Sequence, residues 1–273
     1  MKCIICISNE WNNVMLISIR GDTMSHHIVD FKNISYSYPD GSKAVEGINA
    51  CIRHGESVAI VGANGAGKST LLKLLVGILM PDQGEIRLGD LPVTKKTLNM
   101  IRQQIGFTFQ DPEDQLFNTS VYNDVAFGPR NYGLEEEEVE KRVVKALQTV
   151  GIEHLIHRAP YKLSGGEKRA ASIATVLSME PSVLAMDEPT AALDPKSRRR
   201  LIKLLQGFMH TKLIATHDLD MALELCSRTI VLKNGRIEYD GPSAEIMTNS
   251  QLLEQCGLEQ PLSLQGCPIC GKK

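Results

Sequence analysis

The stretch Gly62-Ala63-Asn64-Gly65-Ala66-Gly67-Lys68-Ser69-Thr70 decides the fold. It matches the phosphate-loop pattern, in which a glycine and four variable residues precede Gly-Lys-Ser. Glycines are needed there because backbone N–H groups must turn inward together around phosphates. Ser57–Val61 reads as the strand before the loop, and Gly67 to about Leu79 as the helix after it, ended by Pro81. We therefore predict an α/β domain that binds a nucleoside triphosphate.

Each polar group of this loop has an expected task. Lys68 would meet the β- and γ-phosphate oxygens, Ser69 would ligate Mg²⁺, and the start of the following helix adds positive potential. The nucleotide-binding residues predicted in the loop are Gly62, Asn64, Gly65, Gly67, Lys68, Ser69 and Thr70.

A second motif lies at Val183-Leu184-Ala185-Met186-Asp187-Glu188. We expect a fully apolar strand with Asp187 at its carboxyl end, holding Mg²⁺ directly or through water. Glu188 would polarise the attacking water as general base. An acid pair that ends a strand can also be a helix cap or a surface pair, but its order after a phosphate loop favours catalysis.

A third motif, Leu163-Ser164-Gly165-Gly166-Glu167, makes the chain resemble the nucleotide-binding subunits of ATP-binding-cassette (ABC) transporters. The resemblance runs from about Ile28 to Pro261. It implies a P-loop NTPase of ABC type: a mostly parallel sheet core, an antiparallel β subdomain, and a helical subdomain inserted at about 111–178. It also implies ATP hydrolysis with Mg²⁺. We predict that the ATPase domain comprises residues 24–261.

The family motifs imply further site residues. Tyr38 would stack on adenine, although an aromatic side chain there could equally pack against the sheet. Gln110 would sense Mg²⁺ or water and link the catalytic core to the helical subdomain. His217 would contact the γ-phosphate and Glu188. The remaining expected contacts reach the nucleotide held by an opposite subunit, and come from Ser164, Gly165, Gly166 and Asp194.

The chain also resembles the importers of cobalt or nickel and the energy-coupling-factor (ECF) importers of vitamins. Asp111–Phe117 and Val121–Pro129 carry this resemblance. Gly165–Arg169 and Thr216–Asp220 lean toward the cobalt/nickel branch. The fifth signature residue is Glu167 where the family commonly has Gln, a departure that leaves the expected contacts of Ser164 and the glycines in place. The sequence leaves open the cargo and the direction of transport.

The resemblance implies partners as well. Two copies of the chain, or the chain and a close paralogue, would sandwich two ATP molecules. They would grip a transmembrane coupling protein that works with a substrate-binding membrane subunit, at the cytoplasmic face of the cell membrane. A net charge of −2 argues against nucleic acid as a partner. No apolar run reaches the 18 or so residues of a membrane-spanning helix.

Another class remains, the soluble ABC ATPases that act on ribosomes or chromosomes. Ribosome-acting members carry two cassettes per chain, whereas this chain has one Leu-Ser-Gly-Gly. Chromosome-acting members separate phosphate loop and signature by a long coiled coil, and the longest helix expected here is Glu135–Val150. A kinase or small GTPase would share the phosphate loop but has no use for the signature.

Hydrophobic patterns predict the remaining elements. The expected strands are Ile28–Tyr36 and Val45–Ile52 as an antiparallel pair, Glu85–Leu88, Ile105–Phe109, Lys212–Thr216 and Thr229–Lys233. The expected helices are Val121–Arg130, Glu135–Val150 with Gly151 as its stop, Lys196–His210 and Leu219–Cys226. One short helix is expected beyond Pro242.

The two ends of the chain differ from the rest. Met24 is expected to be the true start, which makes 1–23 an untranslated or disordered extension. We treat 262–273 as a polar tail. Seven cysteines, three of them scattered singly, favour reduced thiols. Four others form two Cys-x-x-Cys pairs that could join in a zinc site, although a solvated tail is the simpler interpretation: Cys3, Cys6, Cys267 and Cys270.

Overall fold

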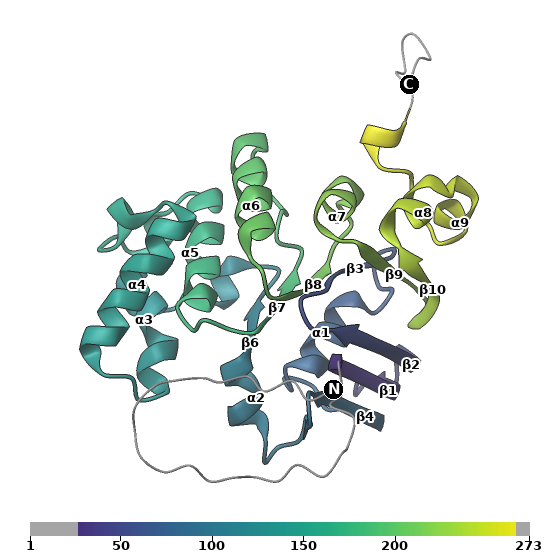
Figure 1. Cartoon of the computed structure of the whole chain (residues 1–273), viewed down its shortest axis with the longest axis horizontal. Coiled ribbons are helices and arrows are strands. Elements are labelled where there is room, and N and C mark those ends of the chain that lie inside the picture. The colour runs from purple at the N-terminus through teal and green to yellow at the C-terminus, as the bar shows by residue number, and fades with distance from the viewer. Residues whose placement is uncertain (1–26, 266–273) are drawn as a thin grey trace, which may run out of the picture.

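The computed structural model describes residues 27–265, and within this range the strands form two sheets (Figure 1). The smaller sheet has the order β2-β1-β4-β5, and the pairings between neighbours are antiparallel. Its strands are β1 (His27–Ser37), β2 (Lys43–Arg53), β4 (Gln83–Leu88) and β5 (Leu91–Pro92). The predicted antiparallel pair is confirmed.

The larger sheet has the order β10-β9-β3-β8-β7-β6. All neighbours in it are parallel except β10 and β9, which form an antiparallel edge. Its strands are β3 (Ser57–Val61), β6 (Ile105–Thr108), β7 (Val183–Asp187), β8 (Thr211–Ala215), β9 (Arg228–Lys233) and β10 (Arg236–Pro242). The carboxyl ends of β3, β7 and β8 therefore meet at one edge of the sheet, which is where ligands bind in parallel sheets.

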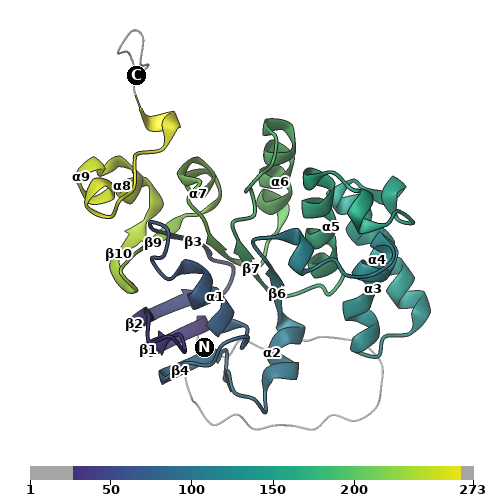
Figure 2. The ribbon, with the colours of Figure 1, turned by 180° about the vertical axis from the view of Figure 1, so that it is seen from behind.

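The central strands β3, β7 and β8 are mainly apolar and buried, as expected where both faces of a sheet are covered. In β3, Val58 and Ile60 face a core shared with the small sheet and α1 (Lys68–Leu75), whereas Ala59 and Val61 face a second core. Helices α6 (Pro195–Gly207) and α7 (Leu219–Leu225) lie over this second face (Figures 1 and 2).

A group of helices lies between β6 and β7 in the sequence, at the end of the molecule opposite the small sheet (Figure 2). It comprises α3 (Val121–Asn131), α4 (Glu136–Val150) and α5 (Gly165–Leu177). Helix α4 ends where predicted, at Gly151, whose φ of 70° is the left-handed conformation that glycine adopts without strain. The buried side chains of α4 pack into the second core.

The structure corrects several predicted boundaries. Helix α1 ends at Leu75 and not near Leu79, because Gly77 has φ 65° and leaves the helix. Helix α6 ends at Gly207 and not at His210. Two short helices follow β10 where one was expected, α8 (Ser243–Thr248) and α9 (Ser250–Gln255).

Strands β5 and β10 and helix α2 (Leu98–Gln104) were not expected. Within the described part of the chain, no helix combines the length and the apolar character needed to cross a membrane. The expected extension 1–23 and both Cys-x-x-Cys pairs lie outside the described residues.

Candidate functional site

The phosphate loop connects β3 to α1, as its sequence predicts. A Cβ on Gly62 would lie 2.3 Å from the carbonyl oxygen of Leu232 in β9, and one on Gly67 would lie 2.5 Å from that of Ala44. Gly67 also has φ 103°, which other residues rarely adopt. The loop is thus pressed between neighbouring strands, and only glycine fits at these two positions.

Lys68 begins α1, and its ammonium group folds back inside the loop. Nζ donates hydrogen bonds to the carbonyl oxygens of Gly62 (2.8 Å) and Ala63 (3.1 Å). Burial lowers the pKa of Lys68, and the charges of Glu188 and Asp187 oppose this shift. A buried cation beside a ring of backbone amides is a strong attractor for phosphate oxygens.

A cavity of about 580 Å³ opens above the loop. Its walls include the loop residues Asn64 to Thr70, together with Tyr38, Gln110 and Glu188. Tyr38 is half-buried, and its hydroxyl lies 2.9 Å from Oγ1 of Thr70. The Tyr38 ring also meets Tyr36 edge-on at 5.3 Å between centroids. The structure thus brings an aromatic ring, the phosphate loop, an amide side chain and a carboxylate around one space.

Asp187 ends β7 directly beside the start of α1. Its Oδ1 accepts a hydrogen bond of 3.0 Å from Oγ of Ser69, and the residue is only 2 % exposed. The pKa of Asp187 is raised, mainly by burial and also by the charge of Glu188. The hydrogen bond from Ser69 opposes this shift in pKa. A hydroxyl and a carboxylate oxygen placed this way are the ligands that a hard divalent cation prefers.

Glu188 follows in an uncommon backbone conformation, with φ 46°. Its Oε2 accepts hydrogen bonds from Oγ1 of Thr216 (3.1 Å) and from the backbone N–H of His217 (3.2 Å). Nδ1 of His217 lies 2.9 Å from the same oxygen. Left-handed backbone at a non-glycine residue costs on the order of 1 kcal/mol or more, and such strain collects at functional sites. The side chain is buried, yet it lines the phosphate-loop cavity.

Gln110 follows β6 and is held by a residue that the sequence did not suggest, Arg169 of α5. The Arg169 guanidinium donates to the carbonyl oxygens of Phe109 (2.8 Å) and Gln110. Arg169 is 3 % exposed, and its Nε has no hydrogen-bond partner within the described chain. Burial lowers its pKa, while the charges of Asp111, Asp187 and Glu188 raise it. Gln115 forms a second link between this loop and α5. Its Oε1 accepts a hydrogen bond from the backbone N–H of Phe109, and its Nε2 donates to groups of α5.

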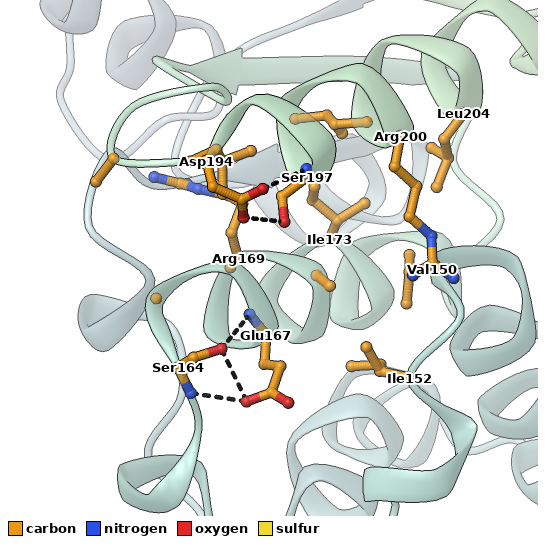
Figure 3. Close-up of a pocket in the computed structure, with 16 residues that line it drawn as sticks. Val150, Ile152, Ser164, Glu167, Arg169, Ile173, Asp194, Ser197, Arg200 and Leu204 are labelled. Atoms are coloured by element: carbon orange, nitrogen blue, oxygen red, sulfur yellow. Dashed lines mark hydrogen bonds between the residues drawn. The ribbon is translucent and has the colours of Figure 1, made fainter.

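The predicted signature forms the start of α5 (Figure 3). Ser164 is its N-cap, and Ser164 and Glu167 form a reciprocal capping box. Asp194 caps α6 nearby, accepting from the backbone N–H groups of Lys196 and Ser197 at 2.9 and 3.1 Å. These residues line a cavity of about 370 Å³ whose floor is apolar.

The structure therefore divides the predicted site residues between two places. Tyr38, the phosphate loop, Gln110 and Glu188 share one cavity, with Asp187 and His217 in contact with members of this group. The signature residues Ser164, Gly165 and Gly166 and the cap residue Asp194 line the cavity at the start of α5. Of these, Gly165 also lines a further cavity of about 560 Å³, together with Ser69, Gln110 and Asp187. Neither Ser164 nor Asp194 lines the phosphate-loop cavity.

A further polar network was not predicted. Asp218 caps α7, pairs with Arg198 of α6 at 2.7 Å, and accepts from Thr190 at 3.1 Å. Since Asp218 directly follows His217, this network fixes the backbone that contacts Glu188. The sequence signal was weak, because an Asp before a helix is usually a simple cap.

Known proteins share this arrangement. Residues 45–191 match the family model described as ABC transporter. A protein of Geobacter sulfurreducens, named as a candidate ABC transporter ATP-binding protein, is 57 % identical over 91 % of this chain and 100 % of its own. The energy-coupling factor transporter ATP-binding protein EcfA of Methanothermobacter thermautotrophicus is 42 % identical over 86 % of this chain and 77 % of its own.

A solved structure agrees with these matches. The structure of cbiO1 from Clostridium perfringens, described as part of the ABC transporter complex cbiONQ, is similar with a TM-score of 0.74 and 42 % identity. The similarity covers 85 % of this chain and 94 % of cbiO1. On the family model, the identities and the fold, the chain belongs to the ABC transporter family, as an ATP-binding subunit that hydrolyses ATP.

Proposed function

We propose that the chain powers a membrane importer of cobalt or nickel ions, working as one of two ATPase subunits that close around two ATP molecules. The observation that carries the two-subunit part is the separation described above. Ser164, Gly166 and Asp194 line a cavity that no phosphate-loop residue lines. We therefore infer that a nucleotide in the loop takes its signature contacts from another subunit. The second subunit would be another copy or a close paralogue.

Within one subunit, each residue has a task that fits its position. The loop amides and Lys68 would hold the β- and γ-phosphates, and Tyr38 would stack on adenine. Glu188 would take the proton of the attacking water, and His217 would contact the γ-phosphate and keep the Glu188 carboxylate in place. Ser164, Gly165, Gly166 and Asp194 would contact the nucleotide of the opposite subunit.

The oxygen donors also suit Mg²⁺. Ser69 and the buried Asp187 are already joined by a hydrogen bond, and both line a cavity of about 560 Å³ together with Gln110. These three residues would hold the ion, which when bound neutralises charge on the phosphate oxygens.

The choice of cargo rests on sequence. Asp111–Phe117 and Val121–Pro129 resemble the cobalt/nickel and the ECF importers alike, and Gly165–Arg169 and Thr216–Asp220 favour the cobalt/nickel branch. The overall likeness to cbiO1 supports an assembly with membrane subunits at the cytoplasmic face. The likeness to EcfA keeps an ECF vitamin importer as the alternative. No observation favours a soluble ABC ATPase without a membrane partner.

A pull-down tests the proposal. Tagged Glu188→Gln is incubated with detergent-solubilised native membranes, ATP and Mg²⁺, and bound proteins are identified by mass spectrometry. Lys68→Ala, which should lose ATP binding, is the matched control. We expect a coupling protein and one dedicated metal-binding membrane subunit. Several unrelated small vitamin-binding proteins would move the assignment to an ECF importer, and ribosomal proteins without a membrane partner would overturn it.

A further inference from the structure

The acidic residue of the signature makes a specific contact at the start of α5 (Figure 3). Oε2 of Glu167 accepts a hydrogen bond from the backbone N–H of Ser164 at 2.8 Å and from the Ser164 hydroxyl at 2.9 Å. In return, the backbone N–H of Glu167 donates to the same hydroxyl oxygen at 3.4 Å. The Ser164 hydroxyl is thus engaged on both sides by one residue.

This contact decides what the hydroxyl can offer to a ligand. A serine hydroxyl has one proton, and here that proton points to a carboxylate. Hydrogen bonds to an ionised acceptor are among the stronger ones in proteins. A phosphate oxygen that approaches Ser164 needs a hydrogen-bond donor. The Ser164 hydroxyl must therefore break its bond to Glu167 and turn its proton to the phosphate; otherwise the phosphate meets only a lone pair of the hydroxyl oxygen.

The charge of Glu167 persists at neutral pH. The backbone and hydroxyl bonds from Ser164 hold the pKa of Glu167 below its ordinary value, and the charges of Arg158 and His154 lower it further. A second carboxylate is close by, because Oδ2 of Asp194 would lie 3.9 Å from a Cβ built on Gly166. The lining of this cavity therefore includes the carboxylates of Glu167 and Asp194, along with the guanidinium groups of Arg169 and Arg200.

Helix capping explains the hydrogen bonds but does not require the charge. The reciprocal capping box is formed by Glu or Gln at this position with the same geometry. A negative charge in the first turn favours the helix, yet it also occupies the positive helix start that an incoming anion would use.

Resting on the function proposed above, we propose that Glu167 sets the ATP affinity of the composite site by competing with the γ-phosphate of the opposite subunit's ATP for the Ser164 hydroxyl and the start of α5. The chain then closes its ATP sandwich at a higher ATP concentration than it would with glutamine in this place. Glu167 is an affinity-determining residue, and the phosphate loop of its own chain is unaffected by it.

The test compares ATP-dependent dimerisation of Glu188→Gln with that of Glu167→Gln/Glu188→Gln by sedimentation velocity with Mg²⁺. At low salt, we expect the double variant to need about two- to fivefold less ATP for half-maximal dimer, the size of a charge effect at a helix start. Since salt screens this repulsion, the ratio should fall toward one at roughly 1 M salt. ATP binding to the monomer should be unchanged.

The matched control is Glu137→Gln in the same background, because Glu137 is an exposed acid in the first turn of α4 and gives the same change in net charge. It should leave half-maximal ATP unchanged. If Glu167→Gln leaves the ATP concentration for half-maximal dimer unchanged or raises it, the role of Glu167 is overturned. The same holds if the lowered ATP requirement persists at high salt. Neither result would affect the two-subunit proposal. If Glu188→Gln fails to dimerise with ATP at all, a second copy of the chain is ruled out as the partner subunit.

Discussion

Nδ1 of His217 lies 2.9 Å from Oε2 of Glu188, so the ends of two neighbouring parallel strands are joined by a side-chain contact at the edge of the nucleotide cavity. Glu188 directly follows β7, and His217 follows β8 with Thr216 between them. The register of the two strands puts Asp187 beside Ala215. The backbone N–H of His217 and the hydroxyl of Thr216 reach the same oxygen. The carboxylate is thus oriented by residues that closely follow the carboxyl ends of β7 and β8.

Replacing His217 tests this orientation. We expect His217→Ala to lower kcat for ATP hydrolysis by about 10–100-fold, with a smaller change in the affinity for ATP, because Thr216 still holds Glu188. Steady-state kinetics and equilibrium ATP binding measure the two effects. His210→Ala, outside the cavity, is the control, and an equal loss in both variants would argue against a role for the contact.

Asp187 allows a test that separates stability from ligand binding. Burial raises the pKa of Asp187, so its ionised form is disfavoured in the free protein. We expect Asp187→Asn to raise the Tm without nucleotide by about 2–4 °C at pH 7. Because a raised pKa favours the protonated acid, the gain should shrink as pH falls. The further stabilisation by Mg²⁺ and ATP should be lost.

Thermal unfolding with and without Mg²⁺ and ATP measures both parts of the Asp187 prediction. The control variant Asp90→Asn removes an exposed charge. It should leave the Tm unchanged both with and without Mg²⁺ and ATP. Retention of the full Mg²⁺-dependent stabilisation in Asp187→Asn would show that Asp187 does not bind the metal.

Arg169 links the start of the signature helix to the Gln110 loop. We expect Arg169→Gln to lower kcat more than it raises KM for ATP, because the phosphate loop stays intact while Gln110 loses its anchor. Leaving two carbonyl groups unpaired should also cost about 1–3 kcal/mol of stability. Arg169→Lys should recover part of kcat.

The control for Arg169 is its neighbour Lys168, whose ammonium pairs with the exposed Glu113. Lys168→Gln should change stability by less than about 1 kcal/mol. Full activity of Arg169→Gln would remove the proposed anchoring role.

The Arg198–Asp218 pair gives a pH-dependent prediction. Burial alone would raise the pKa of Asp218, but the bonds from Arg198 and from the backbone N–H of Met221 outweigh it and lower the pKa. A lowered pKa means that the pair stabilises the fold above the unfolded-state pKa, about 4, and that this is lost as pH falls below it. We expect Arg198→Met to lower the free energy of unfolding by about 1–2 kcal/mol at pH 7.

Urea unfolding at pH 7 and at about pH 2 measures this loss of unfolding free energy, which should be much smaller at the lower pH. Arg199→Met removes an adjacent and more exposed pair with Glu224, and should cost less at both pH values. An equal cost of Arg198→Met at both pH values would contradict the assigned ion pair.

The sequence predicted those parts of the fold whose burial is strong. The central strands β3, β7 and β8 are apolar on both faces, and α4 has a regular apolar stripe that ends in a glycine. Helix α2 was missed because Ile101 is its only buried residue. Strand β10 was missed because it is an exposed edge with little apolar pattern, held by its pairing with β9.

The same contrast applies to the site. Lys68, Ser69, Asp187 and Glu188 were predictable because phosphate chemistry dictates these residue types at these places in the chain. Arg169 was not, since its task depends on a loop that is 60 residues away in sequence. A signal was present, because Arg169 is a long cation directly before the small residues Ala170, Ala171 and Ser172 of a packed helix.

The most direct test of the two-subunit site is whether the signature is needed for ATP-driven pairing. Sedimentation velocity with Mg²⁺ and ATP compares Glu188→Gln with Ser164→Arg/Glu188→Gln, and ATP binding to each monomer is measured separately. We expect a dimer for Glu188→Gln, a monomer for the double variant, and equal ATP binding by both. A double variant that dimerises as readily as Glu188→Gln would contradict the proposed role of the signature in pairing.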